Sequence, residues 1–224
     1  MCGRYTLAAE IEPLQARFQF ETPVSDYAPS YNIAPSQEVL AVIRDADTNR
    51  AGLLRWGLVP SWAKDSKVGY RMINARAESA AEKPSFRRAM HQRRCLVLAD
   101  GYYEWQRHDG QKIPIYIRLR SREPFAFAGL WERWHGEDDT TLVTCTILTT
   151  EANEWLRPIH HRMPVILEPH QEALWLDRSV SEPDALQPLL EPVQADILEA
   201  YAVSSQVNSA RYNSPACILP AATA

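Results

Sequence analysis

Residues 93–107 read RRCLVLADGYYEWQR, an apolar run that reaches Asp100-Gly101 and continues as an aromatic one. Both halves have the composition of strands that are at least half-buried. The following HDGQK (108–112) places Asp109-Gly110 before the strand-like IPIYIRLR (113–120), as in a β-hairpin. This part of the chain therefore predicts neighbouring antiparallel strands.

Similar apolar, β-branched or aromatic runs, separated by turn residues, occur on either side of this segment. They cover residues 38–45, 51–59, 124–134 and 141–150. Helix patterns are fewer and cover residues 11–20, 77–92 with a break near Pro84, 169–177 and 183–190, the last two opened by proline. We expect an α+β fold with a mostly antiparallel, barrel-like β-sheet core and flanking helices.

The bulk properties are those of one soluble domain. No linker divides the 224 residues, so we expect a single domain over residues 1–224. With 46% hydrophobic and 23% charged residues, the chain has no apolar run near the ~18 residues of a membrane span and no secretion leader. We therefore expect a cytoplasmic protein that does not bind membranes.

Charge is unevenly distributed along the chain. A net charge of -4 argues against indiscriminate binding to polyanions, but it leaves room for a local basic groove. Arginines at 87, 88, 93 and 94 form one group, for which a solvated helix face is the ordinary interpretation.

The four cysteines, Cys2, Cys95, Cys145 and Cys217, are widely spaced, with no C-x-x-C pair. This spacing predicts neither a zinc site nor a disulfide framework, and we expect no metal or other cofactor. Cys95 and Cys145 lie in strand-like runs and should be buried, inert thiols. Cys2 differs, because its small side chain allows an aminopeptidase to remove Met1 and leave an amine and a thiol on adjacent carbons.

Two chemistries use an N-terminal cysteine. In an N-terminal hydrolase the thiol is the nucleophile and the α-amine is its base. The MCG start is shared with class II glutamine amidotransferases, although their further motifs cannot be placed here and Arg4 replaces the usual apolar residue. In the second chemistry the amine condenses with an aldehyde and the thiol closes the Schiff base to a thiazolidine, which uses both groups.

The stretch YRMINARAES (70–79) offers Asn74, Arg76 and Glu78 at a spacing of two. In an extended segment all three would point the same way, with Asn74 available to the N-terminal amine and Arg76 to a phosphate. The solvated face of an ordinary strand is the alternative.

Glu104 stands between Tyr103 and Trp105 in the segment that follows Asp100-Gly101. Aromatic walls would desolvate its carboxylate and raise its pKa, which suits proton transfer near neutral pH. A solvent-facing glutamate on a hairpin is the alternative.

The stretch LRPIHHRMPVIL (156–167) contains two adjacent histidines. The residue before a proline favours extended geometry, and extension backward would place His160 and Arg162 on one face and His161 elsewhere. Arginine suits bidentate phosphate contact, whereas a structural histidine is the plainer interpretation of His160.

Aromatic residues and prolines near arginines suggest stacking surfaces for single-stranded DNA, where each base contributes about 1–3 kcal/mol. Tyr31, Asn32 and Pro35 lie in SYNIAPS (30–36). In RWGLVPSWAK (55–64), Trp56 is expected in the core and Trp62 on a loop as a platform.

Seven motifs occur in order from residue 2 to about residue 215: MCGRY, YNIAPS, RWGLVPSW, INARAE, LADGYYEW, IHHRMPVIL and VSSQVN. Together they resemble the SOS response-associated peptidase (SRAP) family, also called abasic-site processing proteins. The resemblance implies a protein that binds single-stranded DNA at an abasic site and joins the ring-opened sugar aldehyde as a thiazolidine. It also implies weak lyase activity and, from the family name, a self-processing peptidase.

The resemblance also assigns residues. The implied catalytic residues are Cys2, Asn74, Glu104 and His160, and the implied DNA contacts are Arg4, Asn32, Pro35, Trp62, Arg76 and Arg162. Asn74 would position the amine, Glu104 would move protons, and His160 would assist ring opening or crosslink reversal. Arg4, Arg76 and Arg162 would hold phosphates.

Two positions depart from the family pattern. Ala63 stands where some relatives carry a second aromatic, and Asn213 stands where an acidic residue is expected. The implied partner is single-stranded DNA with abasic sites, bound by a monomer that is nucleoid-associated on DNA. A thiol peptidase or amidohydrolase and a non-catalytic single-strand binding module are the alternatives.

Overall fold

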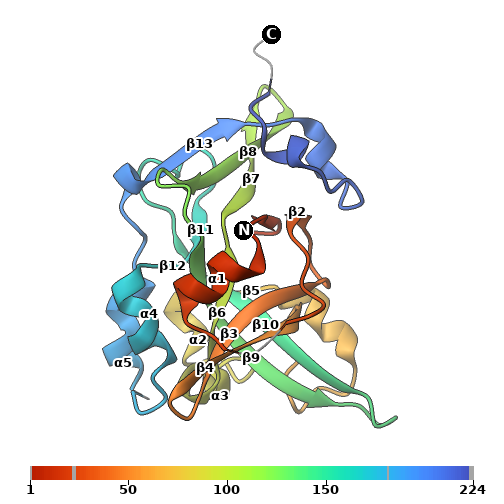
Figure 1. Cartoon of the computed structure of the whole chain (residues 1–224), viewed down its shortest axis with the longest axis vertical. Coiled ribbons are helices and arrows are strands. Elements are labelled where there is room, and N and C mark those ends of the chain that lie inside the picture. Colours follow the sequence, from red (N-terminus) through yellow and green to blue (C-terminus); the bar gives the residue numbers. More distant parts are fainter. Residues whose placement is uncertain (1, 22–23, 181, 222–224) are drawn as a thin grey trace.

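The computed structural model describes residues 2–21, 24–180 and 182–221 (Figure 1). The strands are β1 (Tyr5–Leu7), β2 (Ser30–Ile33), β3 (Glu38–Asp45), β4 (Thr48–Trp56), β5 (Asn74–Arg76), β6 (Arg94–Ala99), β7 (Gly101–His108), β8 (Gln111–Leu119), β9 (Phe125–His135), β10 (Thr141–Glu151), β11 (Arg162–Pro164), β12 (Ile166–Leu167) and β13 (Leu198–Ala202). The helices are α1 (Ile11–Phe18), α2 (Ala77–Ala80), α3 (Arg87–Gln92), α4 (Pro169–Leu176) and α5 (Pro183–Leu186).

Five strands close into a barrel in the order β10-β4-β3-β6-β9, and β9 pairs back to β10. Strand direction can alternate all the way round a closed ring only if the number of strands is even. A five-stranded ring must therefore contain a parallel pair, and this pair is β4 with β10. Strands β5 and β11 also pair with β10, and β12 pairs with β9.

A second sheet has the order β13-β8-β7-β1-β2 and is antiparallel throughout. The segment 93–107 supplies a strand to each sheet, because β6 ends in the barrel at Ala99 and β7 begins in the second sheet at Gly101. Asp100, between them, accepts hydrogen bonds from the Thr6 hydroxyl and from the amide of Ala9 (3.1 Å). One carboxylate thus fastens the crossing point to the N-terminal segment.

The predicted hairpin is confirmed. Asp109 and Gly110 have φ values of 48° and 79°, and His108 pairs with Gln111, as in a two-residue turn with both central residues left-handed. The expected helices are also found: α1 and α4 match their patterns, and α2 and α3 flank the break at Pro84. Residues 183–190 form α5 followed by a 3-10 turn.

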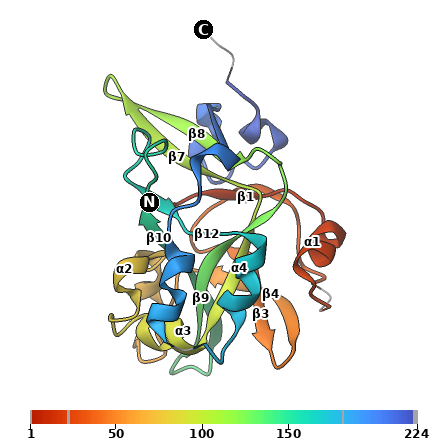
Figure 2. The same cartoon turned by 90° about the vertical axis from the view of Figure 1, so that its left-hand side faces the viewer.

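Helices α3 and α4 pack on the outside of the barrel, against β6 and β9 (Figure 2). The α+β fold with a mostly antiparallel, barrel-like core and flanking helices is therefore confirmed. In the part of the chain that the structure describes, no helix is long and apolar enough to cross a bilayer.

The core contains the side chains that the sequence predicted for it. Trp56 is 1% exposed and packs edge-on against Tyr5, with ring centroids 5.3 Å apart. Cys95 and Cys145 are buried free thiols. The Trp56 indole also donates to the carbonyl of Ile73 (2.8 Å), and so the core fixes the residue next to β5.

The loop that carries Trp62 is held by a close backbone approach. Gly57 has a φ of 129°, and a Cβ on it would lie 2.6 Å from the carbonyl oxygen of Gly69. Only glycine accommodates both the conformation and the contact.

Replacing Gly57 with alanine should therefore lower the free energy of unfolding by about 2–4 kcal/mol, because the left-handed backbone and the steric overlap both act on the folded state. Urea unfolding measures the change. Gly52→Ala is the matched control, since nothing lies within 4 Å of its Cβ position. Equal stabilities of the two variants would show that position 57 does not require glycine.

Candidate active site

Cys2 lies just before β1, between the two sheets. Strand β1 pairs with β7 on one edge and with β2 on the other, and the Tyr103 amide donates to the Arg4 carbonyl (2.9 Å). The Cys2 side chain is fully buried. Burial, and next the negative charge of Glu104, raise the pKa of the Cys2 thiol, so the neutral thiol is the resting form.

Asn74 reaches this cysteine from the barrel side. Its Nδ2 donates to the Cys2 carbonyl at 2.8 Å, and β5 is held in place by parallel pairing of Asn74 with Ile147. Its Oδ1 is buried and has no hydrogen-bond partner within residues 2–21, 24–180 and 182–221. The site therefore holds an acceptor ready for a donor beside the backbone of Cys2.

Glu104 is 4% exposed on β7. The pairing of Tyr5 with Tyr102, carried two residues further, brings Glu104 level with Gly3. Burial raises the pKa of the Glu104 carboxyl, and a hydrogen bond from the backbone of Trp105 acts against this rise. A carboxyl with a raised pKa is better suited to proton transfer than an ordinary surface glutamate.

The aromatic neighbour of Glu104 differs from the prediction. Tyr103 and Trp105 face the other side of the sheet, where they pack with Val203 and Val207. Tyr102, two residues from Glu104 and on the same face, is fully buried in the cluster that contains Cys2. The sequence GYYEWQ (101–106) could have identified Tyr102 as this neighbour, because side chains two residues apart on a strand share a face.

His160 and His161 were predicted to point apart, and this was wrong. Their rings stack, with centroids 4.4 Å apart and an interplanar angle of 27°. The Arg162 amide donates to His160 Nδ1 at 3.0 Å, which turns the chain before β11 begins. Burial lowers the pKa of His160, and the charge of His160 lowers the pKa of His161.

Arg162 makes an internal ion pair. Its guanidinium binds Glu78 through both nitrogens (2.6 and 2.9 Å) and is 9% exposed. Glu78 was expected in an extended segment, but β5 ends at Arg76 and Glu78 lies in α2. The phosphate contact expected of Arg162 is not available while Glu78 occupies its fork.

Arg76 is exposed, and a recess of about 340 Å³ opens beside it. The recess is also lined by Glu151, Arg157, His161 and Arg162. Two exposed arginines, Arg76 and Arg157, thus line it together with one carboxylate, Glu151. Arg157 was not predicted, because nothing in its local sequence sets it apart from a surface residue.

Arg4 and Asn32 form one unit. Arg4 donates to Asn32 Oδ1 and to the Val207 carbonyl, both at 2.7 Å. Asn32 is 1% exposed and donates to the carbonyls of Ser209 and Tyr212. The buried amide of Asn32 joins β2 to the C-terminal segment, and the DNA contact expected of Asn32 stays a prediction.

Two further DNA contacts were predicted at Trp62 and Pro35. Trp62 is 63% exposed on the loop after Pro60, as a stacking platform requires. Pro35 is half-buried in the turn between β2 and β3. Asn213 accepts a hydrogen bond from the Tyr31 amide (2.7 Å), a role that an acidic side chain would fill equally well.

Among the described residues, no group of three or more His, Cys, Asp or Glu side chains could hold a metal ion. The site instead gathers a thiol, an amide, a carboxyl and two imidazoles. These groups can position an amine and move protons.

Similar proteins match nearly the whole chain. The family described as SOS response associated peptidase (SRAP) matches residues 1–210. "Abasic site processing protein YoqW" of Bacillus subtilis (strain 168) is 52% identical over 221 residues, which cover 97% of this chain and 99% of that protein. "Abasic site processing protein HMCES" of Pongo abelii is 35% identical over 236 residues, which cover 87% of this chain and 66% of that protein.

Solved structures also match the fold of this chain. A crystal structure of a protein from Bacteroides thetaiotaomicron matches with a TM-score of 0.89 at 28% identity, covering 98% of this chain and 100% of that one. The molecule is thus an α+β barrel protein of the same architecture. By its sequence, the chain belongs to the SRAP family.

The ion pair between Glu78 and Arg162 should make stability depend on pH. Burial raises the pKa of Glu78, but its hydrogen bonds to Arg162 outweigh this and lower it below the usual value. A lowered folded-state pKa stabilises the protein above the unfolded pKa of about 4.3, and the effect is lost as pH falls through the folded value.

Glu78→Gln should therefore reduce stability by about 0.5–1 kcal/mol at pH 7, since the carboxylate is half-exposed, and by less at pH 3.5. Urea unfolding at both pH values tests this expectation. Glu82→Gln, an exposed neighbour, should change little at either pH. If Glu78→Gln lowered the stability equally at both pH values, the charge of Glu78 would not be what stabilises the fold.

Proposed function

We propose that this protein captures abasic sites in single-stranded DNA as a thiazolidine crosslink to Cys2, after removal of Met1. The observation that carries the proposal is the contact of Asn74 with the Cys2 backbone, which leaves a buried, unsatisfied Oδ1 beside it. An α-amine created at Cys2 would offer the missing donor. The names of the relatives, abasic site processing proteins, support the same substrate.

The chemistry balances with the groups present. The ring-opened sugar presents an aldehyde at C1′. The Cys2 amine adds to this carbon, and loss of one water gives a Schiff base. The Cys2 sulfur then adds to the same carbon while its proton passes to the imine nitrogen, and a five-membered ring closes. Glu104, near Cys2 and with a raised pKa, is suited to carry these protons.

A Schiff base that the thiol does not close has another outcome. Loss of the C2′ proton to a base expels the 3′ phosphate by β-elimination and breaks the strand. We therefore also expect the protein to have weak lyase activity. His160, tied to the Arg162 backbone next to the stacked His161, is placed to assist ring opening or crosslink reversal.

A cysteine hydrolase is less well supported. Such an enzyme attacks through a thiolate, and reactive cysteines have lowered pKa values. Burial and the charge of Glu104 instead raise the pKa of Cys2. A neutral thiol that adds to an imine fits this environment better than a nucleophile that attacks an amide.

The crosslink should depend on both groups of Cys2. Wild-type protein mixed with single-stranded DNA bearing an abasic site should give a denaturant-resistant adduct without reductant, visible as a shifted band on denaturing gels. Cys2→Ser keeps the amine but not the sulfur, so its adduct should need borohydride trapping. Cys2→Ala should behave like Cys2→Ser.

Mass spectrometry of the purified chain is the companion measurement, and it should show loss of Met1. A retained methionine would block the amine and exclude the proposed ring. An adduct that survives without reductant in Cys2→Ser would show that the thiol takes no part.

Proton transfer should depend on Glu104. Glu104→Gln should slow crosslinking by about 100-fold, the lower range for general acid–base catalysis, while binding of unmodified DNA stays unchanged. Single-turnover gel assays and fluorescence anisotropy measure the two quantities. Glu172→Gln, a buried carboxyl paired with Arg17 far along the chain, is the matched control. Equal loss of DNA binding in Glu104→Gln would mean that the residue is structural.

A further inference from the structure

A second basic recess, of about 330 Å³, lies on the outside of the barrel, where the ends of β3, α3, β9 and α4 meet. It shares no lining residue with the Cys2 site. Its lining includes Arg44, Gln92, Arg93, Trp131, Arg133 and Arg178. Among the described residues, no acidic side chain lines it.

Buried contacts fix the floor of this recess. Arg94 is 4% exposed, and its guanidinium donates to backbone carbonyls that include those of Met90 (2.8 Å) and Trp175 (2.6 Å). These bonds join the end of α3 to the end of α4. The floor of the recess is therefore held by helices α3 and α4, and Arg178 follows in the turn after α4.

The arginines around the floor retain unused donors. Arg133 and Arg178 are exposed, and neither side chain forms a hydrogen bond or ion pair inside the described ranges. Arg44 donates to Asn49 (2.9 Å), and Arg93 pairs with Glu132. The guanidinium of Arg93 also lies over the Trp131 ring, 5.3 Å from its centroid.

The charges are close enough to repel one another. Burial, and then the charges of Arg88, Arg133 and Arg178, lower the pKa of Arg93. This differs from the solvated helix face that the sequence suggested for Arg93, since arginines from other elements converge on it. Glu132 offsets the charge of Arg93, but no carboxylate in the recess lining offsets the charges of Arg133 and Arg178.

We propose that this recess binds the phosphodiester backbone of DNA, as a second contact on a face separate from Cys2. Guanidinium forks match phosphate oxygens, and Trp131 supplies a flat surface beside them. The choice of DNA among phosphate ligands rests on the proposed function, whereas the anion site itself does not.

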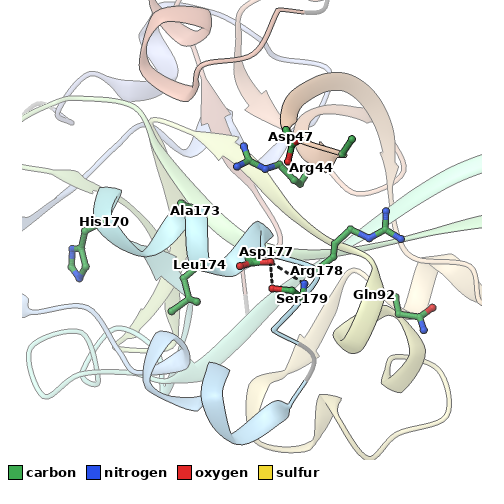
Figure 3. Close-up of a pocket in the computed structure, with 10 residues that line it drawn as sticks. Arg44, Asp47, Gln92, His170, Ala173, Leu174, Asp177, Arg178 and Ser179 are labelled. Atoms are coloured by element: carbon green, nitrogen blue, oxygen red, sulfur yellow. Dashed lines mark hydrogen bonds between the residues drawn. The ribbon is translucent and has the colours of Figure 1, made fainter.

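A wider hollow, of about 1090 Å³, adjoins the recess and gives a strand room to leave it. Figure 3 shows Arg44 and Arg178 in its lining, and Gln92 is also shared with the recess. The hollow carries Asp47 and Asp177, with Asp177 accepting a hydrogen bond from Ser179 (2.7 Å). We therefore place the DNA phosphates in the arginine recess, and the hollow leaves room for the rest of the strand.

The test measures binding of an unmodified single-stranded oligonucleotide by fluorescence anisotropy over a range of salt concentrations. The full chain is compared with the double variant Arg133→Gln/Arg178→Gln. We expect affinity to fall by about fivefold or more. The slope of log affinity against log salt should shrink by about 1.4, since each phosphate contact on single strands contributes about 0.7.

The control is Arg107→Gln/Arg122→Gln, which removes the same charge from exposed positions on β7 and after β8. Wild-type affinity in the Arg133/Arg178 variant would overturn the proposal, as would an equal loss in the control. Thermal unfolding in the presence of inorganic tripolyphosphate tests whether the recess binds free polyphosphate and not DNA. A stabilisation lost in the variant, with DNA affinity intact, would assign the recess to free polyphosphate and also overturn the proposal.

Crosslinking to abasic DNA is measured in parallel at saturating DNA. The Arg133→Gln/Arg178→Gln variant should crosslink to the wild-type extent. Failure of the wild-type protein to crosslink would sink the proposed function alone, because the binding comparison uses DNA without a lesion.

Discussion

The N-terminal strand is held on both edges, by β2 and by β7, and the position of Cys2 depends on this arrangement. A chain end with one paired edge frays readily. Here Asp100 adds hydrogen bonds to Thr6 and Ala9, and Asn74 adds one to the Cys2 carbonyl. The first residues of the chain thereby connect the second sheet to the barrel, and a terminal cysteine acquires the order of a core residue.

Local signals were enough for most of the secondary structure. Asp109-Gly110 predicted a turn that needs positive φ at both positions, and Pro84 predicted the break between α2 and α3. The closure of the barrel could not be predicted in this way. The parallel pairing of β4 with β10 joins residues about ninety positions apart, and it follows from the odd number of strands, which no short segment encodes.

The site was predictable where chemistry is carried by a single residue, and less so where it depends on a partner. Cys2 and Asn74 do lie together, although their roles remain predictions. Asn32 shows the opposite case, because its amide is occupied by Arg4 and the C-terminal segment. Glu78 lies in α2 and not in the extended segment that the sequence predicted, but it still forms an ion pair with Arg162. Such long-range partners cannot be read from spacing alone.

The burial of the Cys2 sulfur has a consequence for its survival. Peroxides and electrophiles react with thiolates that solvent can reach, and oxidation to the sulfinic acid destroys the nucleophile for good. Burial, and next the charge of Glu104, raise the pKa of the Cys2 thiol, and this enclosed neutral thiol is shielded from such damage. This burial thus keeps the sulfur that we propose for ring closure in its reduced form under oxidative stress.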